Sequence, residues 1–190
     1  SLRGKRILIT GSAGSIGSEI VRQVASFSPS SLMLIDSAET PQHDIRRMMA
    51  RDFPSVPCAT VVTSITKADR MENIFKTFLP EYVFHAAAYK HVPMMEDNPC
   101  ESIQNNVLGT KILADLSVKY GVRRFVMVST DKAVNPTNVM GCSKRICEVY
   151  VQSLNKAERD GVVKGQTQFI TTRFGNVLGS NGSVIPIFER

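Results

Sequence analysis

Short apolar runs alternate with longer amphipathic segments along almost the whole chain. The runs have the length and β-branched composition of buried strands, whereas the longer segments repeat apolar residues at helical spacing. Six strands are predicted, at residues 6–10, 32–36, 58–63, 82–85, 124–129 and 168–173. Helices are predicted at residues 15–27, 41–51, 67–78, 100–119 and 139–158, with a loop around Pro93 and Pro99.

This alternation predicts an α/β fold in which helices cover both faces of a parallel sheet. Six strands joined by right-handed crossovers favour the doubly wound order 3-2-1-4-5-6 of the Rossmann fold. No repeat or linker interrupts the series, so residues 1–190 are predicted to form one nucleotide-binding core. The apolar run Val184–Phe188 has no continuation, and we expect a C-terminal substrate-capping part to be largely missing from the chain.

Composition narrows the function classes. With 190 residues, 43% hydrophobic and 21% charged, the chain can bury one sizeable core and is not expected to be disordered. Its apolar runs are too short to span a bilayer. The net charge of +6 comes from scattered basic residues without an aromatic stripe, which disfavours nucleic acid and suits a phosphate-bearing ligand.

Cysteine and histidine spacing predicts neither a metal site nor a disulfide framework. The four cysteines contain no CxxC pair, which suits a reducing cytoplasm, and the three histidines lack metal-ligand spacing. His85 ends an apolar run and is expected to be a structural histidine with satisfied hydrogen bonds.

A glycine-rich turn between the first strand and the first helix predicts a dinucleotide site. Glycines at this spacing allow a tight turn, close approach of a pyrophosphate and close packing of helix on strand. Unpaired N–H groups and the positive end of the helix dipole then favour phosphate. The predicted contacts are Gly11, Ser12, Gly14, Ser15, Ile16 and Gly17.

Asp36, at the end of the second strand, predicts NAD rather than NADP. A carboxylate at this place accepts hydrogen bonds from both ribose hydroxyls and repels a 2′-phosphate. Neither Ser37 nor Ala38 supplies an arginine for such a phosphate. The competing interpretation is an ordinary loop aspartate.

The segment from Ser129 to Lys144 carries the candidate catalytic groups. An apolar strand ends directly on Thr130, Asp131 and Lys132, which supply a hydroxyl, a carboxylate and an amine. Met140 and Lys144 are four residues apart and share one face if a helix begins near residue 139.

The glycine spacing together with Lys144 resembles the extended short-chain dehydrogenase/reductase superfamily. Five segments are similar to the UDP-N-acetylglucosamine 4,6-dehydratases of bacterial polysaccharide and glycoprotein biosynthesis, namely residues 85–93, 106–109, 130–133, 135–138 and 173–180. The resemblance runs from Lys5 to Phe188 and implies NAD as cofactor and a UDP-sugar as substrate and partner.

Two positions depart from the common pattern of these relatives. Most carry tyrosine where this chain has Met140, and a thioether cannot exchange a proton near neutral pH. A branch of the dehydratases also resembles this chain in having methionine there. Many relatives place an aspartate near the adenine where this chain has Ser64.

The reaction that the resemblance implies is a redox-neutral dehydration. The sugar is oxidised at C4, water is eliminated across C5 and C6, and hydride returns to C6. We assign Asp131 as acid toward the C6 hydroxyl and Lys132 as base for the C5 proton, with Thr130 hydrogen-bonding the C4 hydroxyl. Lys132 must be neutral when it acts, through burial or a nearby positive charge such as Lys144, which would also hold the nicotinamide ribose.

Further contacts follow from the same resemblance and from position at the carboxyl edge of the sheet. Additional cofactor contacts are expected at Ser64, Ile65, Ala86, Ala87, Lys90 and Lys144. Substrate contacts are expected at Lys90, Asn106, Asn176, Ser180 and Ser183. The resemblance also implies a cytoplasmic domain, membrane-anchored in many full-length relatives, and a homo-oligomer paired through the helices at 100–119 and 139–158.

Two alternatives remain open from the sequence. One is a nucleotide-sugar 4-epimerase or reductase on the same fold, which does not need Asp131 and Lys132 side by side. The other is a catalytically inert NAD-binding regulatory or assembly module, made inactive by Met140 or by truncation.

Overall fold

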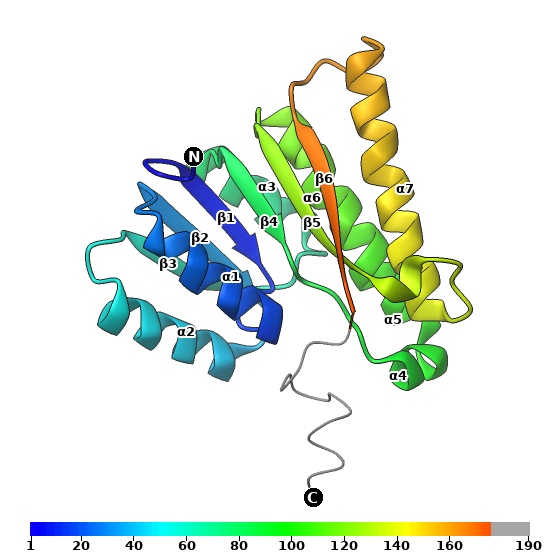
Figure 1. The fold of residues 1–190 in the computed structure, drawn as a ribbon, viewed down its shortest axis with the longest axis horizontal. Helices are drawn as coiled ribbons and strands as arrows, with labels where there is room; N and C mark the ends of the chain where they lie inside the picture. The colour runs from blue at the N-terminus through cyan, green and yellow to red at the C-terminus, as the bar shows by residue number, and fades with distance from the viewer. Residues whose placement is uncertain (176–190) are drawn as a thin grey trace, which may run out of the picture.

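Six parallel strands form a single sheet in the computed structural model, which describes residues 1–175 (Figure 1). The strand order is β3-β2-β1-β4-β5-β6, which confirms the predicted doubly wound topology. The predicted strand boundaries are within one residue of those observed. The strands are β1 (Arg6–Thr10), β2 (Ser31–Asp36), β3 (Cys58–Val62), β4 (Tyr82–His85), β5 (Arg124–Thr130) and β6 (Gln168–Phe174).

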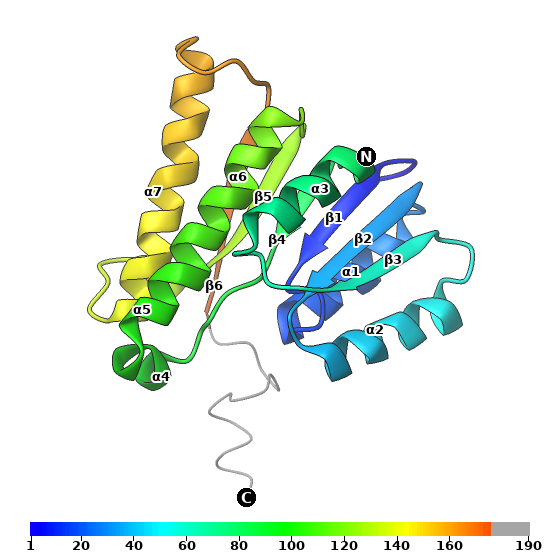
Figure 2. The ribbon, with the colours of Figure 1, turned by 180° about the vertical axis from the view of Figure 1, so that it is seen from behind.

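Helices cover both faces of the sheet and bury a separate core on each. One face carries α1 (Ser15–Ser26) and α2 (Glu39–Asp52), in front of the sheet in Figure 1. The other carries α3 (Ala68–Phe78), α6 (Gly109–Lys119) and α7 (Val139–Arg159), with α3 and α6 in front in Figure 2. Side chains of β1 alternate between the two cores, because successive residues of a strand point to opposite faces.

The segment between β4 and α6 differs from the prediction. The expected loop contains a helix, α4 (Val92–Asp97), and the expected continuous helix is divided into α5 (Pro99–Ser102), a π-helical stretch (Ile103–Leu108) and α6. Pro93 and Pro99 lie in the first turns of α4 and α5, where a missing N–H group costs nothing. The prolines therefore start helices here instead of marking a loop.

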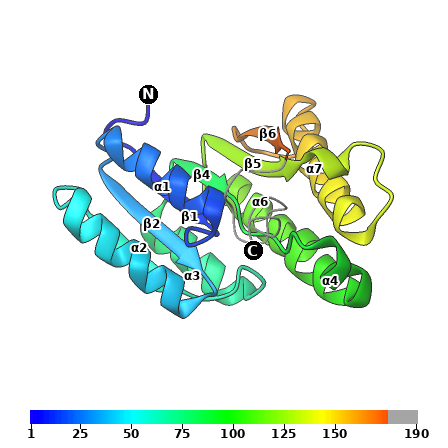
Figure 3. The same ribbon diagram turned by 60° about the horizontal axis from the view of Figure 1, so that its bottom comes forward.

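The carboxyl ends of the strands share one edge of the sheet, which Figure 3 brings forward together with α4. β1 and β4 are hydrogen-bonded neighbours, as are β4 and β5, so the residues after these strands meet at that edge. A crevice at the carboxyl edge is where open α/β sheets bind ligands.

His85 connects the sheet to α6 from inside the protein. Its side chain is completely buried, Nδ1 lies 2.7 Å from Thr10 Oγ1, and Nε2 lies 2.8 Å from Thr110 Oγ1. Burial, with a smaller effect of the Lys144 charge, lowers the pKa of His85 to about 3, so the imidazole is neutral at physiological pH. The prediction of a satisfied structural histidine is confirmed.

A buried carboxylate fastens β6 to α7. Glu148 is fully buried, and Arg173 donates to it through Nε at 2.9 Å and Nη2 at 2.6 Å. Arg145 adds a third hydrogen bond at 3.0 Å. Burial opposes the charge, but the hydrogen bonds, with those from Arg173 the strongest, lower the pKa of Glu148 to about 2.

Among the described residues, no helix has both the length and the apolar character that a membrane crossing requires. Nor does the described part of the chain hold a cluster of three or more His, Cys, Asp and Glu side chains arranged for a metal ion.

Replacing Glu148 by glutamine is expected to destabilise the protein in a pH-dependent way. The folded-state pKa lies below the ordinary value of 4.5, so the stabilisation is complete above that value and is lost as pH falls toward 2. We expect Glu148→Gln to lower the free energy of unfolding by about 3 kcal/mol at about pH 7, and by less than half as much at about pH 3. Denaturant titrations at both pH values measure the two differences.

Glu19→Gln serves as the matched control, because Glu19 pairs with Arg22 at 2.8 Å while both side chains are about half exposed. Its effect should be much smaller than that of Glu148→Gln at about pH 7, because solvent screens an exposed ion pair. An equal loss in Glu148→Gln at both pH values would contradict the assigned ionisation.

Candidate active site

The glycine turn after β1 is built by backbone contacts that exclude side chains. Gly11 has a φ of +68°, and a Cβ added to it would lie 2.5 Å from the backbone nitrogen of Ala87. A Cβ on Gly17 would lie 1.8 Å from the carbonyl oxygen of Gly11. The N–H groups in the first turn of α1, which includes Ser15 and Ile16, have no partner within the helix. This arrangement fits the anion-binding turn predicted from the sequence.

Ser12 is placed differently from the other residues of this turn. Its side chain is fully buried, and its hydroxyl donates to Gln42 Oε1 at 2.8 Å. Gln42 Nε2 in turn donates to the carbonyls of Leu34 at 2.9 Å and Val61 at 3.3 Å. The Ser12 hydroxyl therefore faces the interior and ties the turn to α2, while Ser12 as a cofactor contact stays a prediction.

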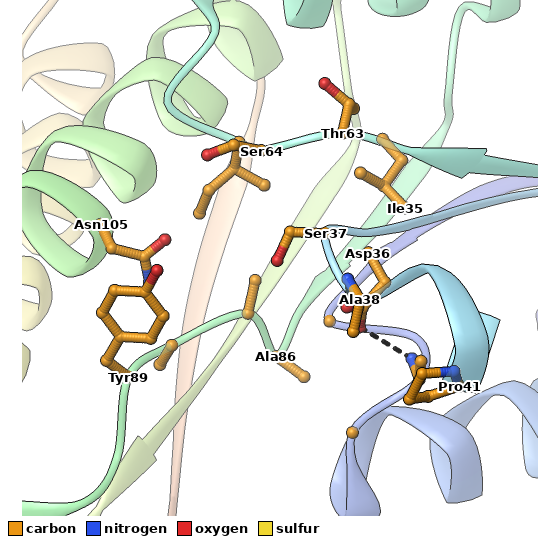
Figure 4. Close-up of a pocket in the computed structure, with 16 residues that line it drawn as sticks. Ile35, Asp36, Ser37, Ala38, Pro41, Thr63, Ser64, Ala86, Tyr89 and Asn105 are labelled. Atoms are coloured by element: carbon orange, nitrogen blue, oxygen red, sulfur yellow. Dashed lines mark hydrogen bonds between the residues drawn. The ribbon is translucent and has the colours of Figure 1, made fainter.

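Asp36 is held in a fixed orientation at the end of β2. Its Oδ2 accepts from the backbone N–H of Ala13 and its Oδ1 accepts from that of Ala38, both at 2.9 Å. The carboxylate lies at the side of a pocket, next to Ala38 and Pro41 (Figure 4). Each oxygen has a further lone pair, so the group retains acceptor capacity for hydroxyls in the pocket.

The pocket has a volume of about 230 Å³ and lies where the chain leaves β1, β2, β3 and β4. It brings together seven of the predicted cofactor residues, namely Gly11, Gly14, Asp36, Ser64, Ile65, Ala86 and Ala87. Tyr89 and Asn105 stand across it from Asp36 (Figure 4). The backbone nitrogen of Thr66 donates to the Ser64 hydroxyl at 3.2 Å.

Sequence reasoning missed several residues that line this pocket: Ala13, Ser37, Ala38, Pro41, Thr63, Ala88, Tyr89 and Asn105. Most of them follow directly on the carboxyl ends of strands, and that position was the available signal. Asn105 gave none, because it lies inside the predicted helix at residues 100–119, away from any strand end.

Thr130, Asp131 and Lys132 form a hydrogen-bonded group where β5 passes into a short 3₁₀ turn, Asp131–Ala133. Thr130 Oγ1 donates to Asp131 Oδ1 at 2.9 Å, and Lys132 Nζ donates to the same oxygen at 3.3 Å. The Asp131 side chain is 58% exposed and that of Lys132 is 37% exposed. Hydrogen bonds from Thr130 and then Lys132 lower the pKa of Asp131. None of the three lines the pocket beside Asp36.

Met140 and Lys144 both lie on the buried face of α7, as the sequence predicted. They are 3% and 4% exposed. Burial lowers the pKa of Lys144, and the nearby Cys147 and Glu148 oppose this effect. The charge of Lys144 also contributes to lowering the pKa of His85.

Asn106 is corrected from a substrate contact to an internal connector. It is 1% exposed, its Oδ1 accepts from the backbone N–H of Tyr89 at 2.8 Å, and its Nδ2 donates to the Tyr89 carbonyl and to Ser143 Oγ, both at 3.0 Å. Its amide has no donor left for a sugar. Lys90 is exposed in the loop after β4, and the predicted contacts Asn176, Ser180 and Ser183 lie outside the described residues.

The carboxyl edge of the sheet thus combines two kinds of chemistry. The pocket around Asp36 offers backbone N–H groups and a carboxylate to a nucleotide, while the β5 end offers groups that exchange protons. Lys144 follows both segments in sequence, and its charge contributes to lowering the pKa of His85 at the end of β4.

Known proteins share this sequence and fold. The chain is 46% identical to the capsular polysaccharide biosynthesis protein CapD of Staphylococcus aureus, covering 99% of this chain and 31% of the relative. It is 34% identical to an inverting UDP-N-acetylglucosamine 4,6-dehydratase of Campylobacter jejuni, covering 98% and 53%. It is also 34% identical to a UDP-glucose 4-epimerase of Rickettsia canadensis, covering 97% and 52%. The chain therefore spans between about a third and about half of these curated relatives.

Solved structures agree with the fold. Pen from Bacillus thuringiensis superposes with a TM-score of 0.88 at 31% identity, covering 99% of this chain and 55% of that one. WbmG from Bordetella bronchiseptica, solved in complex with NAD, superposes with a TM-score of 0.72 at 25% identity, covering 92% and 54%. The sequence profile described as "Polysaccharide biosynthesis protein" matches residues 7–190, and the chain belongs to that family.

Proposed function

We propose that the protein is an NAD-dependent nucleotide-sugar 4,6-dehydratase whose substrate is UDP-N-acetylglucosamine. The observation that carries the proposal is the group formed by Thr130, Asp131 and Lys132 at the carboxyl end of β5. A dehydration needs a base that removes a proton from one carbon and an acid that protonates the hydroxyl leaving the next carbon. This turn supplies an amine and a carboxyl group side by side. The relative from Campylobacter jejuni that carries this activity in its name supports the same class.

The residues around the pocket fit NAD. Gly11 and Gly17 let the turn after β1 pack closely against neighbouring backbone, and the first turn of α1 offers N–H groups to a pyrophosphate. Asp36 would accept the ribose hydroxyls, and Lys144 would hold the nicotinamide ribose. When bound, NAD supplies the hydride acceptor at C4 and the hydride donor at C6. WbmG, a structural relative, binds NAD, which supports this choice of cofactor.

The proton steps fall to the β5 turn. Thr130 orients the C4 hydroxyl and relays its proton to water as C4 is oxidised. The new carbonyl acidifies C5, and Lys132 takes the C5 proton while Asp131 protonates the departing C6 hydroxyl, so that water leaves. A proton returns to C5 as C6 receives hydride, and the product is a UDP-4-keto-6-deoxy sugar.

The reaction requires a protonated Asp131 and a neutral Lys132, and these differ by one proton transfer from the states of the two groups without substrate. Hydrogen bonds from Thr130 and then Lys132 lower the pKa of Asp131, so it is a carboxylate paired with the Lys132 ammonium. Moving one proton within this pair gives a protonated Asp131 and a neutral Lys132 together. Exclusion of water by a bound sugar favours that neutral form, because desolvation penalises charge.

Met140 removes the usual ionisable group from the start of α7 and leaves the β5 turn as the source of acid and base. The thioether is 3% exposed and packs as an apolar side chain. Thr130 therefore relays the C4 proton to water in this proposal, and Asp131 receives its proton from Lys132. An inert module would need the Asp131–Lys132 pair to serve only as a surface ion pair.

A UDP-sugar 4-epimerase is the second candidate, because the Rickettsia canadensis relative is named as one. An epimerase returns hydride to C4 and does not need an acid at C6. The mass of the product separates the two reactions, since only the dehydratase releases water.

Lys132→Ala is expected to lower dehydration of UDP-N-acetylglucosamine by about 10²–10⁴-fold, the usual contribution of a general base. The measurement is loss of water from the sugar by mass spectrometry, with the full-length protein and added NAD. Lys156→Ala, which removes an exposed lysine paired with Asp160, is the matched control and should retain activity. Unchanged turnover in Lys132→Ala would remove Lys132 from the mechanism, and an unchanged product mass with the wild-type protein would reject the dehydratase.

Asp36→Ala is expected to weaken NAD binding by about 10-fold and to reduce the preference for NAD over NADP, because a charged acceptor for the ribose is lost. Titration calorimetry with each cofactor measures both effects. Asp44→Ala, an exposed position on α2, is the control and should bind like the wild type. If Asp36→Ala leaves NAD affinity unchanged, Asp36 is an ordinary loop aspartate.

A further inference from the structure

Helix α7 meets the Asp131–Ala133 turn at a point where no side chain fits. A Cβ added to Gly141 would lie 2.3 Å from the carbonyl oxygen of Lys132 and 3.2 Å from its carbonyl carbon. These are backbone atoms, so rotation of a side chain cannot relieve the contact. Gly109 differs, because its added Cβ would meet only the end of the flexible Ile65 side chain, at 2.5 Å.

Further contacts fix both partners of this approach. Asn138 caps α7 by accepting from the backbone N–H of Gly141 at 2.7 Å, and Glu96 of α4 accepts from that of Val139 at 2.6 Å. In the turn, Thr130 Oγ1 accepts from the backbone N–H of Lys132 at 3.3 Å, and Ala133 is 1% exposed. These hydrogen bonds hold the start of α7 and the turn in place, so an added methyl group would have to break or stretch one of them.

The contact lies between the two sets of groups that the proposed reaction requires. Asp131 and Lys132 belong to the turn, while Met140 precedes Gly141 directly and Lys144 follows it by about one helical turn. The distance from the backbone of Lys132 to the axis of α7 therefore determines how far the acid–base pair lies from the lysine that would hold the cofactor.

We propose that Gly141 is a positioning residue, whose missing side chain sets the spacing between the Asp131–Lys132 pair and Lys144. This inference rests on the proposed function and adds to it a residue that touches neither substrate nor cofactor. The helix uses glycine at a position where alanine would otherwise be favoured, since glycine is a poor helix former.

An alanine at position 141 would have to move the turn away from α7 by about 1 Å, the difference between 2.3 Å and an ordinary contact at 3.4 Å. A misplacement of this size can cost about 10²-fold in rate. The displaced groups are Asp131 and Lys132, which act in elimination, whereas Lys144 and the pocket around Asp36 stay in place.

The test compares Gly141→Ala with the wild type in the full-length protein, using NAD and UDP-N-acetylglucosamine. We expect kcat to fall by about 10²-fold with NAD affinity changed by less than about threefold. Elimination should slow more than oxidation, so the absorbance of reduced cofactor should build up during turnover. The melting temperature should fall, although alanine at an unconstrained helix position would raise it. Unchanged kcat, or a higher melting temperature, would overturn the inference.

Cys142→Ala is the matched control, because it alters an exposed side chain one residue further along the same helix. It should retain wild-type kcat.

A pair of variants at Asn138 covers the case in which Gly141→Ala does not fold. Asn138→Asp keeps the cap on the Gly141 N–H group and should retain kcat, whereas Asn138→Ala loosens the same approach and should lower it. Equal activity of the two variants would overturn the inference.

The outcomes for this inference and for the proposed function are separable. If the wild-type protein converts the sugar by a different reaction, the dehydratase proposal fails, but a selective loss of that reaction in Gly141→Ala still supports the positioning role. If the wild type dehydrates the sugar and Gly141→Ala does so equally well, only the positioning role fails. A wild-type protein without any turnover overturns both.

Discussion

Close approach of backbone to backbone, with no β-carbon between, is the constraint on which the carboxyl edge of the sheet depends. It occurs where α1 meets the turn after β1, where that turn meets the chain after β4, and where α7 meets the turn after β5. Gly17, Gly11 and Gly141 provide the space. Each contact brings a helix or loop nearer to its neighbour than a side chain would allow, and together they place a phosphate-binding turn and an acid–base turn at one edge.

Buried polar side chains then hold these close contacts in register. His85 joins the end of β1 to α6, Gln42 joins the glycine turn to β2 and β3, and Asn106 joins the chain after β4 to α7. Each has its hydrogen bonds satisfied inside the protein, so its burial does not carry the cost of an unpaired group. These residues stabilise the edge through bonds within the protein, and the proposed ligand contacts are Asp36 and the β5 turn.

Periodicity alone predicted the strands, their order and the glycine turn, because those features depend on local pattern and on general rules of handedness. The same reasoning failed around Pro93, since a proline in a first helical turn resembles a proline in a loop. It also predicted ligand contacts at Asn106 and Ser12, because a sequence does not show that the hydrogen-bond partners of a polar side chain lie inside the protein. Gly141 gave no signal either: its role depends on Lys132, which only the packing of α7 onto β5 brings near.

The bond between Ser12 and Gln42 has a consequence for how such sequences vary among relatives. The Gln42 amide donates to backbone carbonyls of two different strands, and its oxygen accepts a hydrogen bond from the Ser12 hydroxyl. Replacing the Ser12 hydroxyl by a methyl group would leave Gln42 Oε1 buried without a hydrogen-bond donor. Replacing the Gln42 amide by a carboxylate would place a negatively charged oxygen against the carbonyl oxygens of Leu34 and Val61, which repel it. The two positions are 30 residues apart in sequence. They should therefore co-vary among relatives, so that a substitution at one is accompanied by a compensating substitution at the other.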